Sequence, residues 1–218
     1  KNVQPIIGMQ LNIFDENYQS QGNESLLISK NEIGYKNLIK ITNILNCKVS
    51  NEKDKKINLE TIDKYKEGLI ILSGGAENGF LGYPATKNDF EITIRRSKRL
   101  KNYFNNNFYI EIQRHGLDRD KMSEPILLEI AKKINVPIVA TNDNFFKFEK
   151  DLESQQVLTL IDKGLTISSD KTRFLSKENY LKTTDQMYKL FSDLPEALEN
   201  TINIAKRCSY CLKENKPI

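Results

Sequence analysis

The chain contains little of what a metal centre or a membrane anchor requires. Its 218 residues include one histidine, three cysteines and six prolines. No apolar run approaches the roughly 20 residues of a membrane-spanning helix, and no signal peptide opens the sequence. A zinc site at Cys208 and Cys211 would need a second cysteine pair or nearby histidines, so two buried or half-buried thiols are the simpler interpretation. We therefore expect a cytoplasmic globular protein with no membrane partner.

The chain is only modestly basic. Its formal net charge is +4 and its pI is about 8.8, whereas a nucleic-acid-binding domain usually has a pI above about 9 with its charge clustered. One cluster lies on the amphipathic helix predicted for Phe90–Phe104, opposite its apolar stripe, and comprises Arg95, Arg96, Lys98, Arg99 and Lys101. Such a face could contact a DNA backbone. A charged helix face is more often simply solvated, and we favour that interpretation.

Short apolar runs alternate with helical patterns along most of the chain. The predicted strands are Gln4–Ile13, Ser25–Ser29, Leu69–Leu72, Phe108–Ile112 and Pro137–Ala140. The predicted helices follow Asn31, cover Thr61–Lys66, Phe90–Phe104, Ser123–Asn135 and Leu152–Ile161, and follow Thr184 and Ser192. This alternation implies right-handed crossovers and a largely parallel sheet or barrel. The predicted fold class is therefore α/β.

Polar residues that follow the predicted strands are the candidate site residues, because in parallel α/β proteins the chemistry lies at the carboxyl ends of the strands. Asp143 follows the buried run Pro137–Ala140 and is the first carboxylate to test. His115 follows the preceding strand and could be a ligand or an acid–base group, although a single histidine is more often structural. The turn Ser73–Gly79 could bind phosphate through its backbone N–H groups. It lacks the spacing of a phosphate-binding motif, so a tight turn is the simpler interpretation.

Six motifs, in this order and spacing, resemble a known family. They read P-I-I-G-M-Q, L-L-I-S-K-N-E-I-G-Y-K-N-L, G-L-I-I-L-S-G-G, Y-I-E-I-Q-R-H-G-L, P-I-V-A-T-N-D and L-P-E-A-L-E-N-T-I-N-I-A-K-R-C. The chain resembles the PHP (polymerase and histidinol phosphatase) domain at the amino terminus of bacterial replicative DNA polymerase III alpha subunits. The resemblance implies a distorted (β/α)7 PHP barrel, incomplete at its amino terminus, with a helical C-terminal extension. It implies a PHP domain over residues 1–212 that lacks its first strands, and the start of a linker to the polymerase core over residues 213–218.

The same resemblance identifies the positions at which active family members bind a cluster of three metal ions. A family glutamate falls on Gln10, a histidine on Glu24, a cysteine on Gly75 and a second histidine on Phe145, whereas an aspartate is kept as Asp143. Gly75 and Phe145 cannot bind metal, and Gln10 offers only a neutral amide oxygen. A metal cluster needs carboxylate or thiolate charge, with imidazole to complete its shells. Asp143 and Glu24 are therefore the remaining metal ligands, sufficient at best for one weakly bound ion.

The resemblance thus implies a metal-depleted scaffold within a replicative polymerase. Such a domain would brace the polymerase core and dock the proofreading exonuclease (epsilon) subunit. The parent subunit, a DNA-directed DNA polymerase, would join deoxynucleotides to a primer with Mg²⁺. We expect no catalytic or cofactor-binding residue in the chain itself, and Zn²⁺ or Mn²⁺ only if the PHP site is active. The implied partners are the rest of the alpha subunit, the exonuclease, the other holoenzyme subunits and primer–template DNA.

Two alternatives stay open. An active metal-dependent PHP phosphoesterase or 3′–5′ exonuclease would need intact metal ligands, and Gln10, Gly75 and Phe145 argue against it. A pure interaction module would show an exposed apolar patch without a concave polar site. The expected loss of the first strands would also leave sheet edges unpaired, so edge-to-edge dimerisation or poor solubility could follow.

Overall fold

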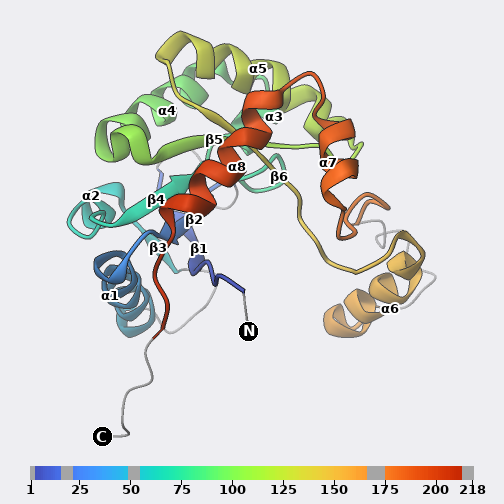
Figure 1. The fold of residues 1–218 in the computed structure, drawn as a ribbon, viewed down its shortest axis with the longest axis horizontal. Coiled ribbons are helices and arrows are strands. Elements are labelled where there is room, and N and C mark those ends of the chain that lie inside the picture. The colour runs from blue at the N-terminus through green and yellow to red at the C-terminus, as the bar shows by residue number, and fades with distance from the viewer. Residues whose placement is uncertain (1–2, 16–21, 49–54, 166–174, 213–218) are drawn as a thin grey trace, which may run out of the picture.

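The computed structural model describes residues 3–15, 22–48, 55–165 and 175–212, and within them it shows one six-stranded sheet and eight α-helices (Figure 1). The strands are β1 (Gly8–Ile13), β2 (Glu24–Ser29), β3 (Lys56–Ile57), β4 (Leu69–Leu72), β5 (Phe108–Gln113) and β6 (Ile138–Thr141). The helices are α1 (Glu32–Lys48), α2 (Leu59–Asp63), α3 (Gly82–Thr86), α4 (Phe90–Phe104), α5 (Asp118–Ile134), α6 (Leu152–Lys163), α7 (Thr184–Leu190) and α8 (Pro195–Arg207), with 3₁₀ turns η2 (Asn105–Asn107) and η3 (Glu149–Asp151). The linker predicted for residues 213–218 lies outside the described residues.

The sheet has the strand order β3-β1-β2-β4-β5-β6 and is open in the described part of the chain, with β3 and β6 at its edges. β4, β5 and β6 pair in parallel, as do β1 and β3, whereas β2 runs antiparallel to both β1 and β4. β2 reverses direction after β1, since residues 14–23 between the two strands are fewer than a parallel crossover connection needs. The predicted α/β class is confirmed, and the predicted incomplete barrel corresponds to an open sheet of mixed strand direction.

Alternate residues of the central strands pack on opposite faces of the sheet. β4 is buried at every position, as expected for a strand that is covered on both sides. On one face, Ile70, Tyr109 and Val139 pack with Ile204 of α8. The other face forms the larger core, to which α1, α4 and α5 contribute. The carboxyl ends of β4, β5 and β6 therefore meet at one end of a sheet that is fixed from both sides.

Helix α8 covers the β6 edge of the sheet. Asn200 Nδ2 donates a hydrogen bond of 2.8 Å to the backbone oxygen of Ile138 at this edge. α8 starts with Pro195 in its first turn, where proline fits because the N–H it lacks would have no helical partner. Part of the edge that an incomplete barrel would leave unpaired is thereby occupied within the chain itself.

The prediction that Arg96 belongs to a solvated basic face of α4 is wrong. This side chain is fully buried, and its guanidinium donates to the backbone oxygens of Gly22 and Phe80 at 2.6 and 2.7 Å. It stacks 4.3 Å from the centroid of the Phe80 ring and pairs with buried Asp15 at 3.2 Å. In the sequence Arg96 is adjacent to Arg95, which is half exposed. Its acidic partner, Asp15, precedes it by several elements, so the local sequence does not indicate the buried ion pair.

The predicted helix boundaries are closest where the apolar period is clearest. α4 covers the predicted residues, whereas α5 begins at Asp118 and not at Ser123, with Asp118 and Asp120 supplying acid to its first turn. The short elements β3 and α3 were not predicted, because neither spans enough residues to show a period. In the described chain, no helix is both long enough and apolar enough to cross a lipid bilayer.

Candidate functional site

A cavity of about 380 Å³ opens at the end of the sheet where β4, β5 and β6 finish. All five positions that the family resemblance assigned to metal ligands line it, namely Gln10, Glu24, Gly75, Asp143 and Phe145. They come from β1, from β2, from the turn after β4 and from the loop after β6. The resemblance therefore brought together residues that the fold also brings together. The cavity is also lined by Glu77, Glu111 and Gln113, which the sequence did not single out.

Glu111 and Gln113 form the centre of this site. The buried Glu111 carboxylate accepts hydrogen bonds from the backbone N–H of Gly74 at 3.2 Å, from the Thr141 hydroxyl, and from Gln113 Nε2 at 2.9 Å. Gln113 Nε2 also lies 3.2 Å from Thr141 Oγ1 and 3.2 Å from Asp143 Oδ1. One amide nitrogen thus faces two carboxylates and a hydroxyl.

The side chain of Gln113 fills the space that a residue larger than glycine would need at position 75. A Cβ atom placed on Gly75 would lie 1.9 Å from Gln113 Oε1 and 2.6 Å from its Cδ, far closer than van der Waals contact permits. The glycine at position 75 and the inward position of Gln113 therefore depend on one another. A cysteine, the residue that the family resemblance implies for this position, would displace the glutamine amide.

A second glutamine, Gln10, makes a similar contact with Glu24, the other predicted metal ligand. Gln10 Nε2 donates a hydrogen bond of 2.8 Å to Glu24 Oε2. Burial raises the pKa of Glu24, the negative charges of Glu77 and Asp143 raise it further, and the Gln10 hydrogen bond opposes them. Burial likewise raises the pKa of Glu111. The cavity therefore contains several carboxylates close together, and two glutamine amides donate hydrogen bonds to them.

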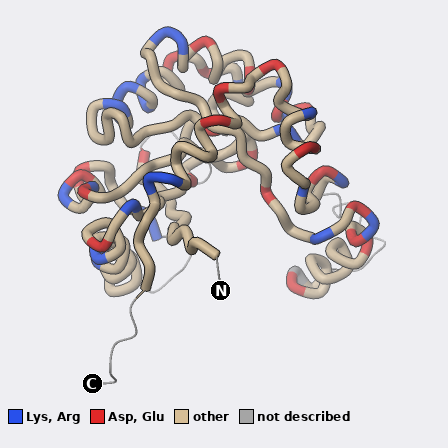
Figure 2. The backbone as a smooth tube through the Cα atoms, viewed as in Figure 1, with Lys and Arg blue, Asp and Glu red and all other residues tan. Residues whose placement is uncertain are grey.

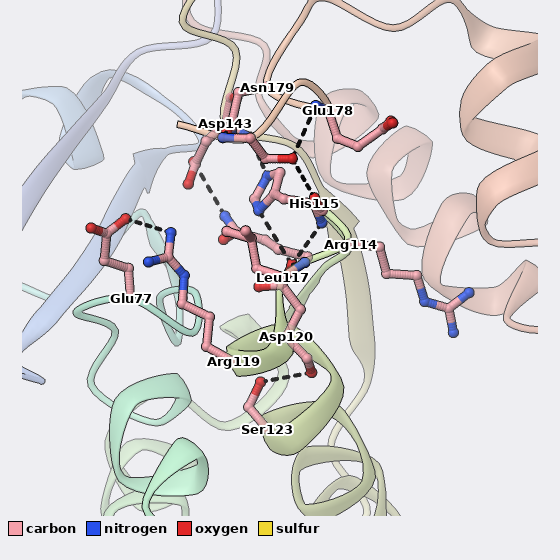
Figure 3. A network of polar contacts seen from close by, with 12 residues as sticks. Glu77, Arg114, His115, Leu117, Arg119, Asp120, Ser123, Asp143, Glu178 and Asn179 are labelled. Carbon is pink, nitrogen blue, oxygen red and sulfur yellow. Dashed lines mark hydrogen bonds and ion pairs between the residues drawn. The ribbon is translucent and has the colours of Figure 1, made fainter. Parts of the chain in front are cut away.

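Asp143 is held through its backbone, which leaves its carboxylate to Gln113. Its N–H donates to His115 Nε2 at 3.3 Å, and its carbonyl oxygen accepts from Asn179 Nδ2 at 3.0 Å (Figure 3). The backbone oxygen of Asn179 in turn accepts from the N–H of Phe145 at 2.9 Å. Phe145 follows in the same loop and is 51% exposed. His115 and Asn179 thus fix the loop after β6, and neither of them lines the cavity.

His115 is buried and hydrogen-bonded, in agreement with the structural role that we favoured for it. It is 4% exposed, its backbone N–H donates to Asp120 Oδ2 at 2.7 Å, and its Nδ1 lies 3.8 Å from the same oxygen. Burial lowers the pKa of the imidazole, although the charges of Asp120 and Asp143 oppose this. A neutral ring keeps a lone pair on Nε2, which is what the hydrogen bond from the Asp143 backbone requires.

The glycine-rich turn after β4 is a close-packed turn. Gly74 has a φ of +80°, and a Cβ atom at this position would lie 2.3 Å from the backbone oxygen of Glu24. The N–H of Gly74 donates to Glu111, and the N–H of Gly79 donates to the oxygen of Gly75 at 2.9 Å. These two N–H groups are thus occupied by protein acceptors, and the close backbone approach at Gly74 accounts for the glycine at that position.

The residues at this site do not fit a trinuclear metal cluster. Across residues 3–15, 22–48, 55–165 and 175–212, no group of three or more His, Cys, Asp or Glu side chains is placed to hold a metal ion. The cavity lining contains carboxylates but neither imidazole nor thiolate, whereas zinc is bound mainly through imidazole and thiolate. An amide N–H directed at a carboxylate also occupies one of the lone pairs that a cation could use.

The sequence of β5 contains a signal for Glu111 and Gln113 that local periodicity does not reveal. The strand reads F-Y-I-E-I-Q, and Glu111 is an acid inside an otherwise apolar run. A carboxylate buried near the carboxyl end of a central strand is costly unless it has partners, so its presence in the sequence is informative. The identity of those partners, Thr141 from β6 and Gly74 from the turn after β4, depends on strand order. Local sequence does not give that order.

Comparison with known proteins places the chain within longer relatives. The PHP domain family matches residues 1–115. Along its whole length the chain is 35% identical over 218 residues to DNA polymerase III subunit alpha of Rickettsia bellii and 36% identical over 219 residues to that of Rickettsia prowazekii, in each case covering 18% of the relative. The corresponding subunit of Caulobacter vibrioides is 32% identical over 221 residues, with 99% of this chain and 19% of the relative covered. The chain therefore spans about a fifth of the length of these relatives.

Proposed function

The chain belongs to the PHP domain family, and we propose that it is the PHP region of a replicative DNA polymerase III alpha subunit that has lost metal-dependent chemistry. In this role it braces the polymerase core and docks the proofreading exonuclease (epsilon) subunit. DNA-directed DNA synthesis, a Mg²⁺-dependent nucleotidyl transfer, belongs to other parts of the parent protein. Similarity to alpha subunits along the whole of this chain supports the polymerase context. The residues that line the cavity support the loss of metal.

The observation that carries the proposal is the position of the Gln113 amide. Its nitrogen lies 2.9 Å from Glu111 Oε1 and 3.2 Å from Asp143 Oδ1. A buried carboxylate is strongly destabilised unless hydrogen bonds or a cation compensate its charge. Here a neutral donor from the chain gives that compensation, and Gly75 leaves the space in which it sits. The same relationship recurs between Gln10 and Glu24.

A scaffold of this kind keeps its shape without a bound ion. The loop after β6 is fixed by His115 and Asn179, and the turn after β4 by the contact of its backbone with Glu111. These contacts tie the carboxyl ends of three strands together through protein groups alone. The region is therefore suited to present a constant surface to the rest of the polymerase and to the exonuclease.

Metal content and cleavage activity test the proposal directly. We expect the purified chain to contain no stoichiometric Zn²⁺ or Mn²⁺ by inductively coupled plasma mass spectrometry, and to leave a chromogenic phosphodiester and a 3′-labelled oligonucleotide intact. A triple variant, Gln10→Glu with Gly75→Cys and Phe145→His, restores the family ligands at three positions and serves as the comparison. Two or three tightly bound metal ions in the unchanged chain, together with cleavage of DNA 3′ ends, would show instead an active PHP exonuclease.

Docking of the exonuclease is tested separately. Within the full alpha subunit, we expect deletion of this region to abolish co-purification of the epsilon subunit, while Glu111→Gln, a substitution inside the cavity, leaves co-purification intact. Retention of epsilon by the deleted subunit would contradict the docking role and would leave the metal result unaffected.

A further inference from the structure

A second polar cluster lies at the opposite end of the sheet from the cavity. Lys30 follows the end of β2, and Ser29 of β2 is paired with Leu69, the first residue of β4. Arg207 is the last residue of α8, and Asn107 ends η2 immediately before β5. The cluster therefore gathers where β4 and β5 begin, whereas the cavity lies where they finish.

A single neutral oxygen serves two cations in this cluster. Asn107 Oδ1 accepts from Lys30 Nζ at 3.1 Å and also from the Arg207 guanidinium. The guanidinium is fixed by two further contacts, donating to the backbone oxygen of Asn106 at 3.1 Å and to the Tyr109 hydroxyl at 2.8 Å. The Lys30 ammonium is thus held beside a guanidinium that cannot move away without breaking several hydrogen bonds.

Within the part of the chain that the structure describes, neither Lys30 nor Arg207 has a carboxylate partner. No ion pair formed among the described residues includes Lys30 or Arg207. Burial lowers the pKa of Lys30, the charge of Arg207 lowers it further, and only the Cys208 thiol acts in the other direction. A like-charge pair of this kind is unfavourable by itself, and an anion bound between the two groups would relieve it.

A structural role explains only half of the cluster. A cation in the last turn of a helix interacts favourably with the helix dipole, and the contacts of Arg207 with Asn106 and Tyr109 fasten α8 to the start of β5. Neither effect requires a second cation. Lys30 could extend into solvent and avoid the guanidinium, yet its ammonium is directed at the same amide oxygen.

We propose that Lys30 and Arg207 form a binding site for a phosphate group of a DNA backbone. A guanidinium fork beside an ammonium matches the oxygens of a phosphodiester, which is charged at every physiological pH. Both side chains are only partly buried, so an incoming phosphate can reach them, and Figure 2 shows basic residues at the C-terminal end of α8. The choice of DNA as the source of the phosphate rests on the proposed function as part of a DNA polymerase.

Binding of a labelled oligonucleotide tests the site on the 218-residue chain. Fluorescence anisotropy at low salt compares Lys30→Gln with the control Lys206→Gln, which removes the same charge from the exposed neighbour of Arg207. We expect Lys30→Gln to weaken binding about fivefold and to reduce the salt slope by about one ion, as for loss of one phosphate contact. Lys206→Gln should weaken binding by less than about twofold, as expected for a charge with no fixed contact. Equal losses in the two variants, or no loss in Lys30→Gln, would overturn the proposal.

Lysine side-chain NMR of the unchanged chain gives a readout that does not depend on a variant folding. We expect inorganic phosphate and the oligonucleotide each to shift the Lys30 ammonium resonance while that of Lys206 stays in place. A shift with polyglutamate but not with phosphate or the oligonucleotide would assign the cluster to an acidic protein partner and overturn the DNA proposal. The metal content of the cavity is measured independently, so failure of this site and failure of the metal-depleted scaffold are distinguishable.

Discussion

Arg96 and Asp15 form an ion pair of 3.2 Å in which both side chains are almost wholly buried. Asp15 follows β1, and Arg96 lies in the middle of α4. Arg95 and Arg99 approach the same carboxylate at 3.9 and 3.8 Å. The three arginines of α4 are therefore arranged around one acid, and Arg96 also binds the backbone of Gly22, two residues before the cavity residue Glu24. The pair therefore helps to fix the segment that leads into β2, which carries Glu24.

Replacement of Arg96 by methionine should lower the free energy of unfolding by about 3–5 kcal/mol, because it removes the nearest cation from the buried Asp15 carboxylate and the donor from two buried backbone oxygens. Urea unfolding followed by circular dichroism measures the loss. Arg95→Met is the matched control, since Arg95 is half exposed, and an exposed pair contributes only about 1 kcal/mol or less. Equal destabilisation by the two substitutions would show that Arg96 acts only through general charge.

Gly75→Cys should destabilise the chain by about 1–3 kcal/mol, the usual cost of overpacking a filled site. The reason is the 1.9 Å approach of the new Cβ to Gln113 Oε1. A double-mutant cycle with Gln113→Ala supplies the control, because the shortened side chain leaves room for cysteine. We expect the cost of Gly75→Cys to fall sharply in that background. A cost that is the same in both backgrounds would locate the strain elsewhere, in the neighbouring turn.

The stability of the chain should decrease as the pH rises above 4.5, in part because of Glu111. Burial raises the pKa of this carboxyl above its ordinary value of 4.5, so the folded state keeps a proton that the unfolded state has already released. The proton-linked stabilisation is complete at low pH and is lost as the pH rises through the folded pKa. Urea unfolding at a series of pH values should give a shallower decline for Glu111→Gln. An unchanged slope would contradict the assignment.

The titration of His115 can be followed without overlap, because the chain contains a single histidine. Burial lowers the pKa of His115 below 6.5, so its one imidazole resonance should titrate below that value in the folded chain and near 6.5 in urea. Because the unfolded state binds a proton that the folded state refuses, this group favours the folded state above pH 6.5. Its contribution is lost as the pH falls through the folded pKa. A folded midpoint above 6.5 would mean that Asp120 and Asp143 dominate over burial.

The sequence predicted those parts of the molecule that depend on local pattern. The apolar period of Phe90–Phe104 and the apolar run of Leu69–Leu72 give α4 and β4 with their observed bounds. Asn31 was correctly expected to cap α1, since its Oδ1 accepts from the N–H of Gly34 at 3.0 Å. In these segments, capping and burial pattern act over a few residues, and the rest of the fold does not override them.

The remaining features arise from contacts between distant segments. The burial of Arg96 depends on Asp15, and the antiparallel direction of β2 depends on its pairing with β4. At the site, Glu24 and Asp143, which the family resemblance implies as metal ligands, line one cavity, and their binding of metal stays a prediction. The resemblance did not identify Gln113, because the reason for its position is the missing side chain at Gly75.

The Gln113 amide has a consequence for how the domain depends on its surroundings. A site that is held together by a bound ion is stabilised in proportion to the logarithm of the free ion concentration, so its folding varies with the supply of that ion in the cell. Gln113 is covalently part of the chain, and its contacts with Glu111 and Asp143 form at the same effective concentration in every environment. Under the proposed loss of metal binding, we expect the protein to fold equally well in metal starvation and metal excess, and chelators to leave its melting temperature unchanged.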